Sequence, residues 1–300
     1  MFPAKDILEA AGVLVAGDAP WQSELRLRQA RWRESLGKQS GRVGNRPVGS
    51  RLPAGDRSSN FLTVVVPAAV RDAKRQRGAL ISAPRIYDNM LSSQPLAFNL
   101  FAELGADSAL GTAVGRALWP DLFATVDEVR FEWSPGRRDP RYLGNRSAFD
   151  VALMGRDGAG SVTCVGIEVK YHENMTQDPG SPDNPRYSEV AAGAGVFRNP
   201  NAPELRALPL RQLWFDHLLA LSLIDDEATG ISRARFVLLA PAINSAAAAV
   251  DAKYRNQLAD ALTYERRTLE EIVAVIRMYT NASWIDDFRR RYLESSDSMT

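Results

Sequence analysis

The chain has 300 residues, 45% of them hydrophobic, and a formal net charge of +1. This composition is typical of a globular chain, and the length suffices for one large domain or for one domain with an appendage. A single cysteine excludes a disulfide framework, and no apolar stretch approaches the roughly 18 residues of a membrane span. Acidic residues near the start also replace the basic flank that a signal peptide requires. We therefore expect a protein of the reducing cytoplasm.

Positive charge is concentrated in the first third of the chain. Residues 22–85 contain fourteen Lys or Arg and four Asp or Glu, so they carry an excess of ten positive charges. We expect residues 1–84 to form a basic helical arm with a flexible loop over residues 37–57, and residues 85–300 to form the main domain. Such an arm suits a phosphate-backbone binder, although a solvated basic helix without a ligand has the same pattern. The candidate contacts lie on a helix that begins at Pro20-Trp21: Arg26, Arg28, Arg31 and Arg33.

The next segments are predicted to be helices, a strand and a basic connection. The helical pattern of residues 86–104 is broken near Ser93, so we expect two helical pieces there. A strand follows over Val126–Trp133. The arginine-rich connection of residues 135–146 then leads into the next strand, and its basic side chains suit either phosphate binding or a solvated turn. Its candidates for nucleic-acid contact are Arg141 and Arg146.

A predicted β-hairpin carries the most informative side chains. Residues 147–154 and 162–171 have strand-like patterns and are joined by a glycine-rich connection. Glu168 and Lys170 point to one face of the second strand, because strand side chains alternate. In a symmetric hairpin Asp150 lies directly opposite Glu168, with their Cβ atoms about 5 Å apart. Two carboxylates this close favour a divalent-metal site, and the alternative is a surface ladder balanced by the lysine.

The rest of the chain predicts a helical and parallel-strand region. Residues 208–224 are apolar almost all round, which indicates a buried helix. The strand expected over residues 234–243 runs parallel to the second hairpin strand if that helix is a normal crossover. Three amphipathic helices that cover the sheet or mediate dimerisation are then expected: residues 246–262, 268–279 and 285–292.

The spacing of Asp150 and the triplet Glu168-Val169-Lys170 resembles the signature of the PD-(D/E)XK nuclease superfamily, with Phe149 where the signature has proline. Three stretches also resemble a family of predicted bacterial nucleases in that superfamily: residues 92–101, 166–172 and 212–219. The resemblance implies a restriction-endonuclease-like α/β fold, in which helices flank a central mixed sheet. It also implies metal-dependent hydrolysis of phosphodiester bonds, with DNA as the expected substrate.

The resemblance further implies roles for the central residues. Asp150 and Glu168 would ligate Mg²⁺ or Mn²⁺, helped by the Val169 carbonyl. Lys170 would orient and help deprotonate the attacking water or stabilise the charge that develops on phosphorus.

Other residues are candidates for the edge of the site. In this superfamily the helix before the sheet often contributes a further polar group. Its candidates here are Glu103 first, then Gln94 and Asn99. Gln212, on the helix after the second hairpin strand, is expected to support the site or contact substrate, or to have a structural role. His172 shares the strand face of Glu168 and could act as a base or a phosphate donor, or only as a hydrogen-bonding group at the strand end.

Two alternatives stay open for the function. The chain could be a catalytically silent nucleic-acid-binding protein of the same fold, or a nuclease that acts on RNA. A role in restriction or defence rests on fold analogy alone. The sequence does not separate endonuclease from exonuclease action, and it leaves a homodimer open.

Overall fold

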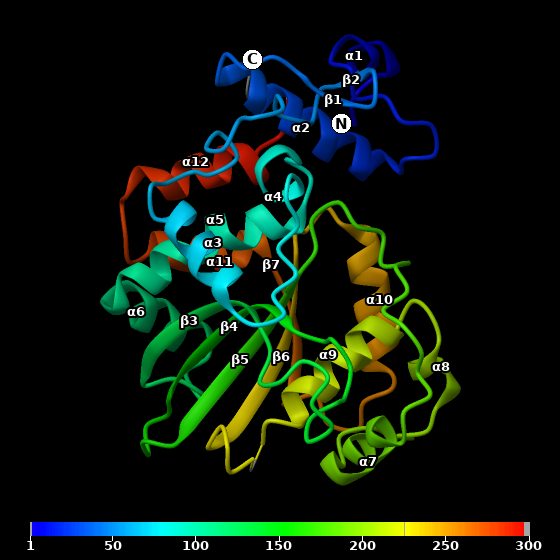
Figure 1. The fold of residues 1–300 in the computed structure, drawn as a ribbon, viewed down its shortest axis with the longest axis vertical. Coiled ribbons are helices and arrows are strands. Elements are labelled where there is room, and N and C mark those ends of the chain that lie inside the picture. Colours follow the sequence, from blue (N-terminus) through cyan, green and yellow to red (C-terminus); the bar gives the residue numbers. More distant parts are fainter. Residues whose placement is uncertain (1, 225, 297–300) are drawn as a thin grey trace.

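The fold is built around a five-stranded mixed sheet with the order β3-β4-β5-β6-β7 (Figure 1). A computed structural model describes residues 2–224 and 226–296. The first three strands are antiparallel, and the last two run parallel to β5. The strand bounds are as follows: β3 (Thr125–Trp133), β4 (Phe149–Arg156), β5 (Val162–Val169), β6 (Ile231–Ala240) and β7 (Tyr264–Thr268). This is the mixed α/β architecture that the sequence predicts.

Helices cover the sheet and bury two large hydrophobic clusters against it. The first cluster includes side chains from these helices: α2 (Pro20–Ser35), α3 (Val66–Arg75), α4 (Arg85–Asp88), α5 (Ser93–Ala106), α6 (Ser108–Leu118), α11 (Leu269–Arg277) and α12 (Ser283–Tyr292). The second cluster includes side chains from four others: α7 (Pro185–Ala194), α8 (Pro203–Arg206), α9 (Arg211–Leu221) and α10 (Ser245–Arg255). The remaining elements lie beside α2 at the top of Figure 1: α1 (Lys5–Ala10), β1 (Gly41–Val43) and β2 (Arg46–Val48). Among the described residues, no helix combines the length and the apolar character needed to cross a bilayer.

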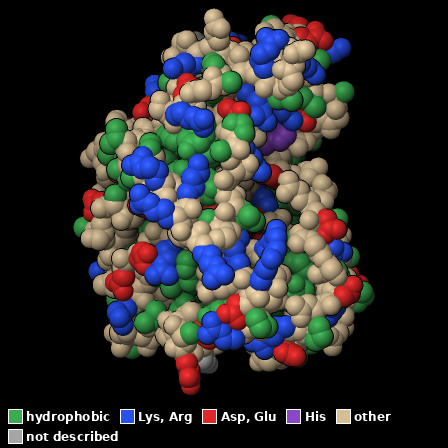
Figure 2. Space-filling model, viewed as in Figure 1, with side chains coloured by type: hydrophobic (Ala, Val, Ile, Leu, Met, Phe, Trp, Pro, Cys, Tyr) green, Lys and Arg blue, Asp and Glu red, His purple; other side chains and the backbone are tan. Residues whose placement is uncertain are grey.

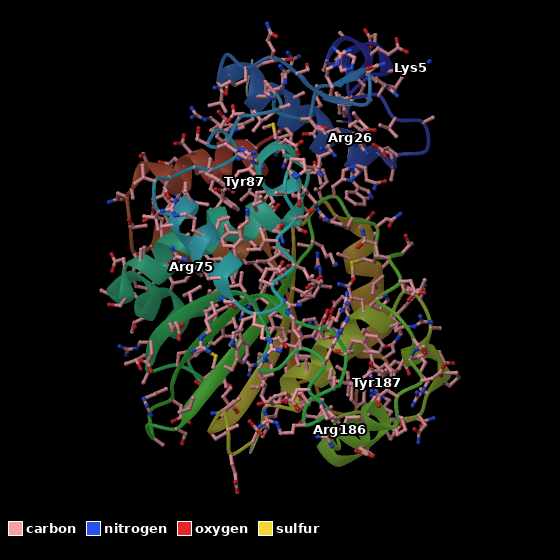
Figure 3. All side chains as sticks on the ribbon, in the orientation of Figure 1. Lys5, Arg26, Arg75, Tyr87, Arg186 and Tyr187 are labelled. Carbon is pink, nitrogen blue, oxygen red and sulfur yellow. The ribbon has the colours of Figure 1, made fainter. Side chains whose placement is uncertain are left out.

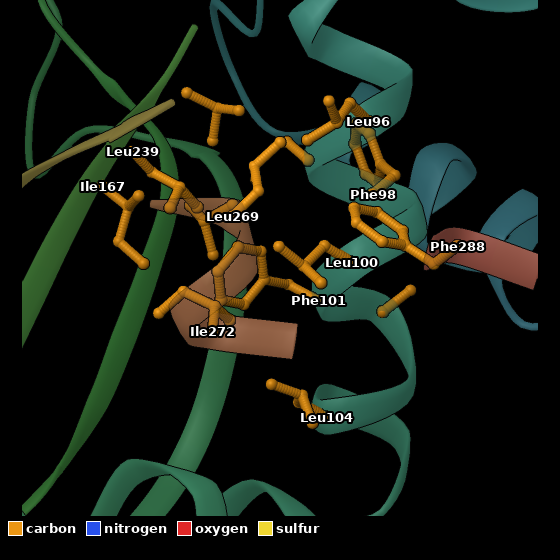
Figure 4. Close-up of a cluster of buried hydrophobic side chains, with 14 of the residues drawn as sticks. Leu96, Phe98, Leu100, Phe101, Leu104, Ile167, Leu239, Leu269, Ile272 and Phe288 are labelled. Carbon is orange, nitrogen blue, oxygen red and sulfur yellow. The ribbon is translucent and has the colours of Figure 1, made fainter. Parts of the chain in front are cut away.

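Apolar side chains of α5 form the centre of the first cluster (Figure 4). In that view Leu100 and Phe101 converge with Ile167 of β5, Leu239 of β6 and Ile272 of α11. A helix enclosed in this way is apolar around most of its surface, which explains its sequence. The packing also fixes the first turn of α5, which contributes to the cavity described below.

Most of the predicted elements are present. The helix expected from Pro20-Trp21 is α2, and the break expected near Ser93 separates α4 from α5. The buried helix expected after the hairpin is α9, and the strand after it, β6, is parallel to β5 as expected.

Some segments differ from the prediction. Residues 37–57, expected as a flexible loop, contain the β1–β2 hairpin. The helix expected over residues 246–262 ends at Arg255, and the chain then forms β7, which was not predicted. This strand lies at the edge of the sheet and has the sequence Tyr-Glu-Arg-Arg-Thr, so it lacks the apolar run of the central strands. Helix α6 was also not predicted.

The N-terminal segment shares the core of the sheet. Trp21 and Leu25 of α2 and Val70 of α3 belong to the same cluster as the sheet residues of Figure 4. Lys and Arg side chains are also spread over the visible face of the molecule rather than gathered at its N-terminal end (Figure 2). The expected division between residues 1–84 and 85–300 is therefore not a division of the hydrophobic core.

Two arginines of α2 are structural. Arg28 and Arg33 are only 4% and 6% exposed. Arg28 donates a hydrogen bond to the Tyr292 carbonyl at 2.5 Å, and Arg33 donates one to the Gly49 carbonyl at 2.8 Å. Buried guanidinium groups need such internal partners, because burial removes their water. Both side chains are buried and bonded to internal carbonyl groups, so the structure does not support the expectation that they bind nucleic acid.

The β4–β5 hairpin is packed closely at Gly166. A Cβ atom at this position would lie 2.5 Å from the ring of Phe149. Phe149 itself stacks with Trp133 and Phe236, with ring centroids 6.3 and 6.5 Å away. Because Phe149 directly precedes Asp150, the absence of a side chain at Gly166 makes room for the ring that fixes the start of β4.

We expect Gly166→Ala to destabilise the protein by about 1–3 kcal/mol, because the added methyl group must displace the Phe149 ring. Urea unfolding followed by tryptophan fluorescence measures the effect. Gly158→Ala is the matched control, since a Cβ there has no atom within 4 Å. Equal unfolding free energies for the two variants would contradict the proposed packing role.

Candidate active site

A polar cavity of about 450 Å³ lies where the β4–β5 hairpin meets the first turns of α5 and α9. Gln212 and Asp216 are four residues apart on α9, so they share one helix face and both line the cavity. Between them, Leu213, Trp214 and Phe215 are apolar and buried. The other polar side chains central to the cavity come from four segments: Gln94, Glu132, Asp150, Glu168 and Lys170.

The hairpin register places Asp150 opposite Glu168. Val151 pairs with Ile167 across the antiparallel strands, so the preceding residue of β4 faces the following residue of β5. One oxygen of the Asp150 carboxylate accepts a hydrogen bond from the backbone N–H of Val169 at 2.8 Å. The predicted hairpin register is therefore confirmed.

Glu168, Lys170 and Gln212 form a closed triangle of contacts. The ammonium of Lys170 lies 2.7 Å from Glu168 Oε1 and donates to Gln212 Oε1 at 3.0 Å. The amide of Gln212 donates to Glu168 Oε1 at 2.6 Å. Burial by itself would lower the pKa of Lys170, but the charges of Glu168, Glu173 and Asp150 outweigh it and raise the pKa above its usual range. Lys170 is therefore a buried cation that Glu168 and Gln212 hold in one place.

Two further carboxylates have no ion-pair partner in the part of the chain that the structure describes. Burial, followed by the charges of Glu168 and Glu132, raises the pKa of Asp150 well above its usual range. Burial and Glu168 likewise raise the pKa of Asp216, whose Oδ2 is buried and has no hydrogen-bond partner. Within the described residues, the ion pairs of the cavity involve Glu132, Glu168 and Glu173 but neither of these aspartates. The cavity therefore concentrates uncompensated carboxylate groups.

Glu132 also lines the cavity, and it has a rare backbone conformation. Its φ angle is 50°, although the residue belongs to β3. A left-handed conformation costs a non-glycine residue about 1–2 kcal/mol. The Glu132 carboxylate accepts hydrogen bonds from Gln94 at 2.7 Å and from Arg137 at 3.3 Å. Backbone strain of this kind, which contacts with neighbouring residues maintain, occurs most often at functional sites. Strand alternation alone does not reveal this residue, which the sequence prediction missed.

A family model for the PD-(D/E)XK nuclease superfamily matches residues 16–294. The chain belongs to this superfamily. The match extends from the residues before α2 through α12, so it includes the N-terminal segment as well as the sheet. No curated protein and no solved structure matches the chain significantly. Membership implies nuclease activity that depends on a divalent metal and acts on a nucleic-acid substrate.

The donor set of this PD-(D/E)XK site suits a magnesium-type ion. Asp150 and Glu168 supply hard oxygen ligands, and a cation would favour the charged forms of Asp150 and Asp216, whose pKa values burial and the neighbouring carboxylates raise. Among the described residues, no three or more Asp, Glu, His or Cys side chains converge as a metal centre. Mg²⁺ is commonly held by one or two carboxylates together with water and substrate phosphate. Two facing carboxylates in this polar cavity therefore fit such an ion.

The structure separates Glu103 from the site. Glu103 is half-buried on α5 and does not line the cavity, whereas Gln94 on the first turn does. Nine residues of helix place the two about 13 Å apart along the axis. Asn99 is fully buried, where its side chain accepts a hydrogen bond from the Leu62 N–H and donates one to the Asn60 carbonyl. The role expected of Glu103 is therefore not supported, and Gln94 is the residue of α5 that borders the site.

His172 also lies outside the active-site cavity. It lines a neighbouring cavity and packs against Trp21, with ring centroids 6.1 Å apart. Burial and the nearby Arg26 lower the pKa of His172 to about 4, so the ring is neutral at physiological pH. It therefore offers no positive charge to a phosphate.

The remaining predicted arginines differ in their surroundings. Three of them are already paired with carboxylates: Arg26, Arg31 and Arg141. Arg26, labelled in Figure 3, lies on α2 and is mostly buried. Arg146 lines the active-site cavity, is exposed, and has no partner for its guanidinium among the described residues. It is the predicted arginine that is best placed for a phosphate.

Asp216→Asn should stabilise the metal-free protein increasingly as the pH rises. Between the ordinary pKa of 3.8 and the raised folded-state pKa, folded wild type binds a proton that the unfolded chain lacks. In this window rising pH destabilises wild type, relative to the variant, by about 1.4 kcal/mol per pH unit. Urea unfolding in EDTA from about pH 5 to about pH 7.5 measures the difference. Asp6→Asn, at an exposed position, controls for the loss of one charge. If the difference in unfolding free energy between Asp216→Asn and wild type does not change with pH, the raised pKa of Asp216 is contradicted.

Proposed function

We propose that this protein hydrolyses phosphodiester bonds in DNA with the help of Mg²⁺ or Mn²⁺. The observation that carries the proposal is the facing pair Asp150 and Glu168 in a buried cavity, with Lys170 held against Glu168. Membership of a nuclease superfamily supports the same chemistry. DNA is proposed from the sequence resemblance, and RNA is kept as an arm of the test.

Asp150 and Glu168 would hold the metal, with the Val169 carbonyl as a proposed third ligand. The Val169 N–H already holds Asp150 in place at 2.8 Å, so the backbone here also orients the first carboxylate. A bound divalent ion lowers the pKa of water and neutralises charge that develops on the phosphoryl oxygens. The protein contributes the orientation of the carboxylates before substrate arrives.

Lys170 is proposed to act as a fixed positive charge. Its raised pKa keeps the ammonium protonated in this arrangement, so it is suited to stabilise negative charge on the phosphoryl oxygens and to orient water rather than to accept a proton. Gln212 is proposed as a positioning residue, because its amide bonds both Lys170 and Glu168. Removing Gln212 would leave the lysine and the carboxylate free to form only a simple ion pair.

The double variant Asp150→Asn with Glu168→Gln should lose divalent-metal binding, because both charged oxygen ligands are removed while the shape is kept. Isothermal titration with Mg²⁺ and Mn²⁺ measures the affinity, and circular dichroism confirms the fold. Asp216→Asn in the same titration shows whether loss of any cavity carboxylate has the same effect. Unchanged metal affinity in the double variant would exclude the assigned ligands.

Lys170→Met should retain metal binding but lose cleavage by about a hundredfold to a thousandfold, the usual cost of removing one group that stabilises developing charge. Lys253→Met is the matched control, because that lysine is exposed on α10 and outside the cavity. The assay compares DNA and RNA of the same sequence with Mg²⁺, Mn²⁺ or EDTA. Cleavage of RNA alone would favour an RNA-directed nuclease, and binding without any cleavage would favour a catalytically silent protein.

A further inference from the structure

Three cavities adjoin one another and are together called the groove, because the active-site cavity shares lining residues with each of the other two. It shares lining residues with a larger cavity of about 1120 Å³ on one side: Leu80, Glu132, Arg137 and Arg146. It shares others with a cavity of about 560 Å³ on the opposite side: Arg85, Glu173 and Gln177. The two outer cavities have no described lining residue in common, so the carboxylates lie between them. Figure 2 shows this face hollowed below a histidine side chain, with Lys and Arg side chains around it.

The larger outer cavity carries guanidinium groups that no other side chain neutralises. Arg77, Arg138 and Arg146 line it and are exposed, and within the described residues their side chains have no hydrogen-bond or ion-pair partner. In contrast, Arg130 and Arg137 in the same cavity are paired with glutamates. Unpaired guanidinium groups are suited to bind phosphate, because their planar array of donors matches two phosphate oxygens.

The active-site cavity is small relative to a DNA duplex. The residues Glu168 and Lys170 are 7% and 5% exposed, and the cavity that they line holds about 450 Å³. This volume is within the range of about 300–1,000 Å³ that accommodates a small-molecule ligand. One strand can place a phosphodiester there, whereas two paired strands would have to remain outside.

We propose that a single DNA strand lies along this groove, with its phosphates against Arg77, Arg138 and Arg146 and its scissile bond at the carboxylates. The proposal rests on the function proposed above and adds to it the path of the substrate. Because the active-site cavity shares Arg85, Glu173 and Gln177 with the cavity beyond it, the strand need not end there. The ion pair between Arg85 and Glu173 at this junction, 3.8 Å long, would have to open for the strand to pass. The protein is therefore an endonuclease that acts on single-stranded DNA.

The phosphate contacts are tested by binding without cleavage. Wild type and the triple variant Arg77→Gln, Arg138→Gln, Arg146→Gln are titrated in EDTA with a labelled single-stranded oligonucleotide across a salt series. Each lost phosphate contact on single-stranded DNA flattens the log-log salt slope by about 0.7, so the triple variant should lose about 2 units.

The matched control removes three exposed cations that lie outside the groove: Arg116→Gln, Arg198→Gln and Lys253→Gln. Its slope should equal that of wild type. Equal slopes for the groove variant and the control would overturn the proposed phosphate contacts, whether or not the protein cleaves DNA.

The path through the site is tested with closed circles. Wild type with Mg²⁺ should cut a closed circular single-stranded DNA at a rate within about tenfold of a linear strand of the same sequence, since neither end is needed. A relaxed duplex circle should resist. Degradation of the linear strand alone, or cleavage of the duplex circle at the rate of the single-stranded circle, would overturn the proposed path. If no DNA is cleaved, the proposed function fails, and the salt series still decides whether the groove binds DNA.

Discussion

Charged groups that leave water need partners, and this requirement organises the active end of the β4–β5 hairpin. Glu132, Asp150, Glu168, Lys170 and Asp216 line one small cavity. Burial, followed by negative charge that Lys170 compensates only in part, raises the pKa values of both aspartates. Without a metal, the charged forms of these aspartates are therefore disfavoured. A divalent cation would favour the charged forms at the place where the reaction is proposed to occur.

The surrounding structure holds these groups in a fixed arrangement. The apolar body of α9 keeps Gln212 and Asp216 directed at the cavity, and the buried α5 places Gln94 beside Glu132. Glu132 remains in its left-handed conformation because Gln94 and Arg137 both bind its carboxylate. Such preorganisation matters in phosphoryl transfer, in which catalysis depends mainly on positioning and on electrostatic stabilisation.

The centre of the site could be predicted from the sequence because strand periodicity determines it. Alternation and a glycine-rich connection are sufficient to place Asp150 opposite Glu168 and Lys170 on the same face as Glu168. In contrast, the burial of Arg28 depends on the carbonyl of Tyr292, 264 positions away, and no local pattern encodes that contact. Glu132 was missed for a similar reason, since its φ angle depends on tertiary partners. Charge density along the chain also does not show which arginines remain available, because pairing and burial in the folded protein decide that.

One buried guanidinium connects α12 with α2, and through α2 with the residue that follows Lys170. Arg291 of α12 is fully buried and donates to the side chain of Gln29 and to both the carbonyl and the side chain of Asn60. Gln29 in turn donates to the hydroxyl of Tyr171, the residue after Lys170. Proteins are synthesised and begin to fold from the N-terminus. A growing chain that lacks α12 would leave these polar groups unsatisfied, at about 1–3 kcal/mol each. The contacts that hold Tyr171 through Gln29 and Arg291 are therefore complete only once α12 is in place.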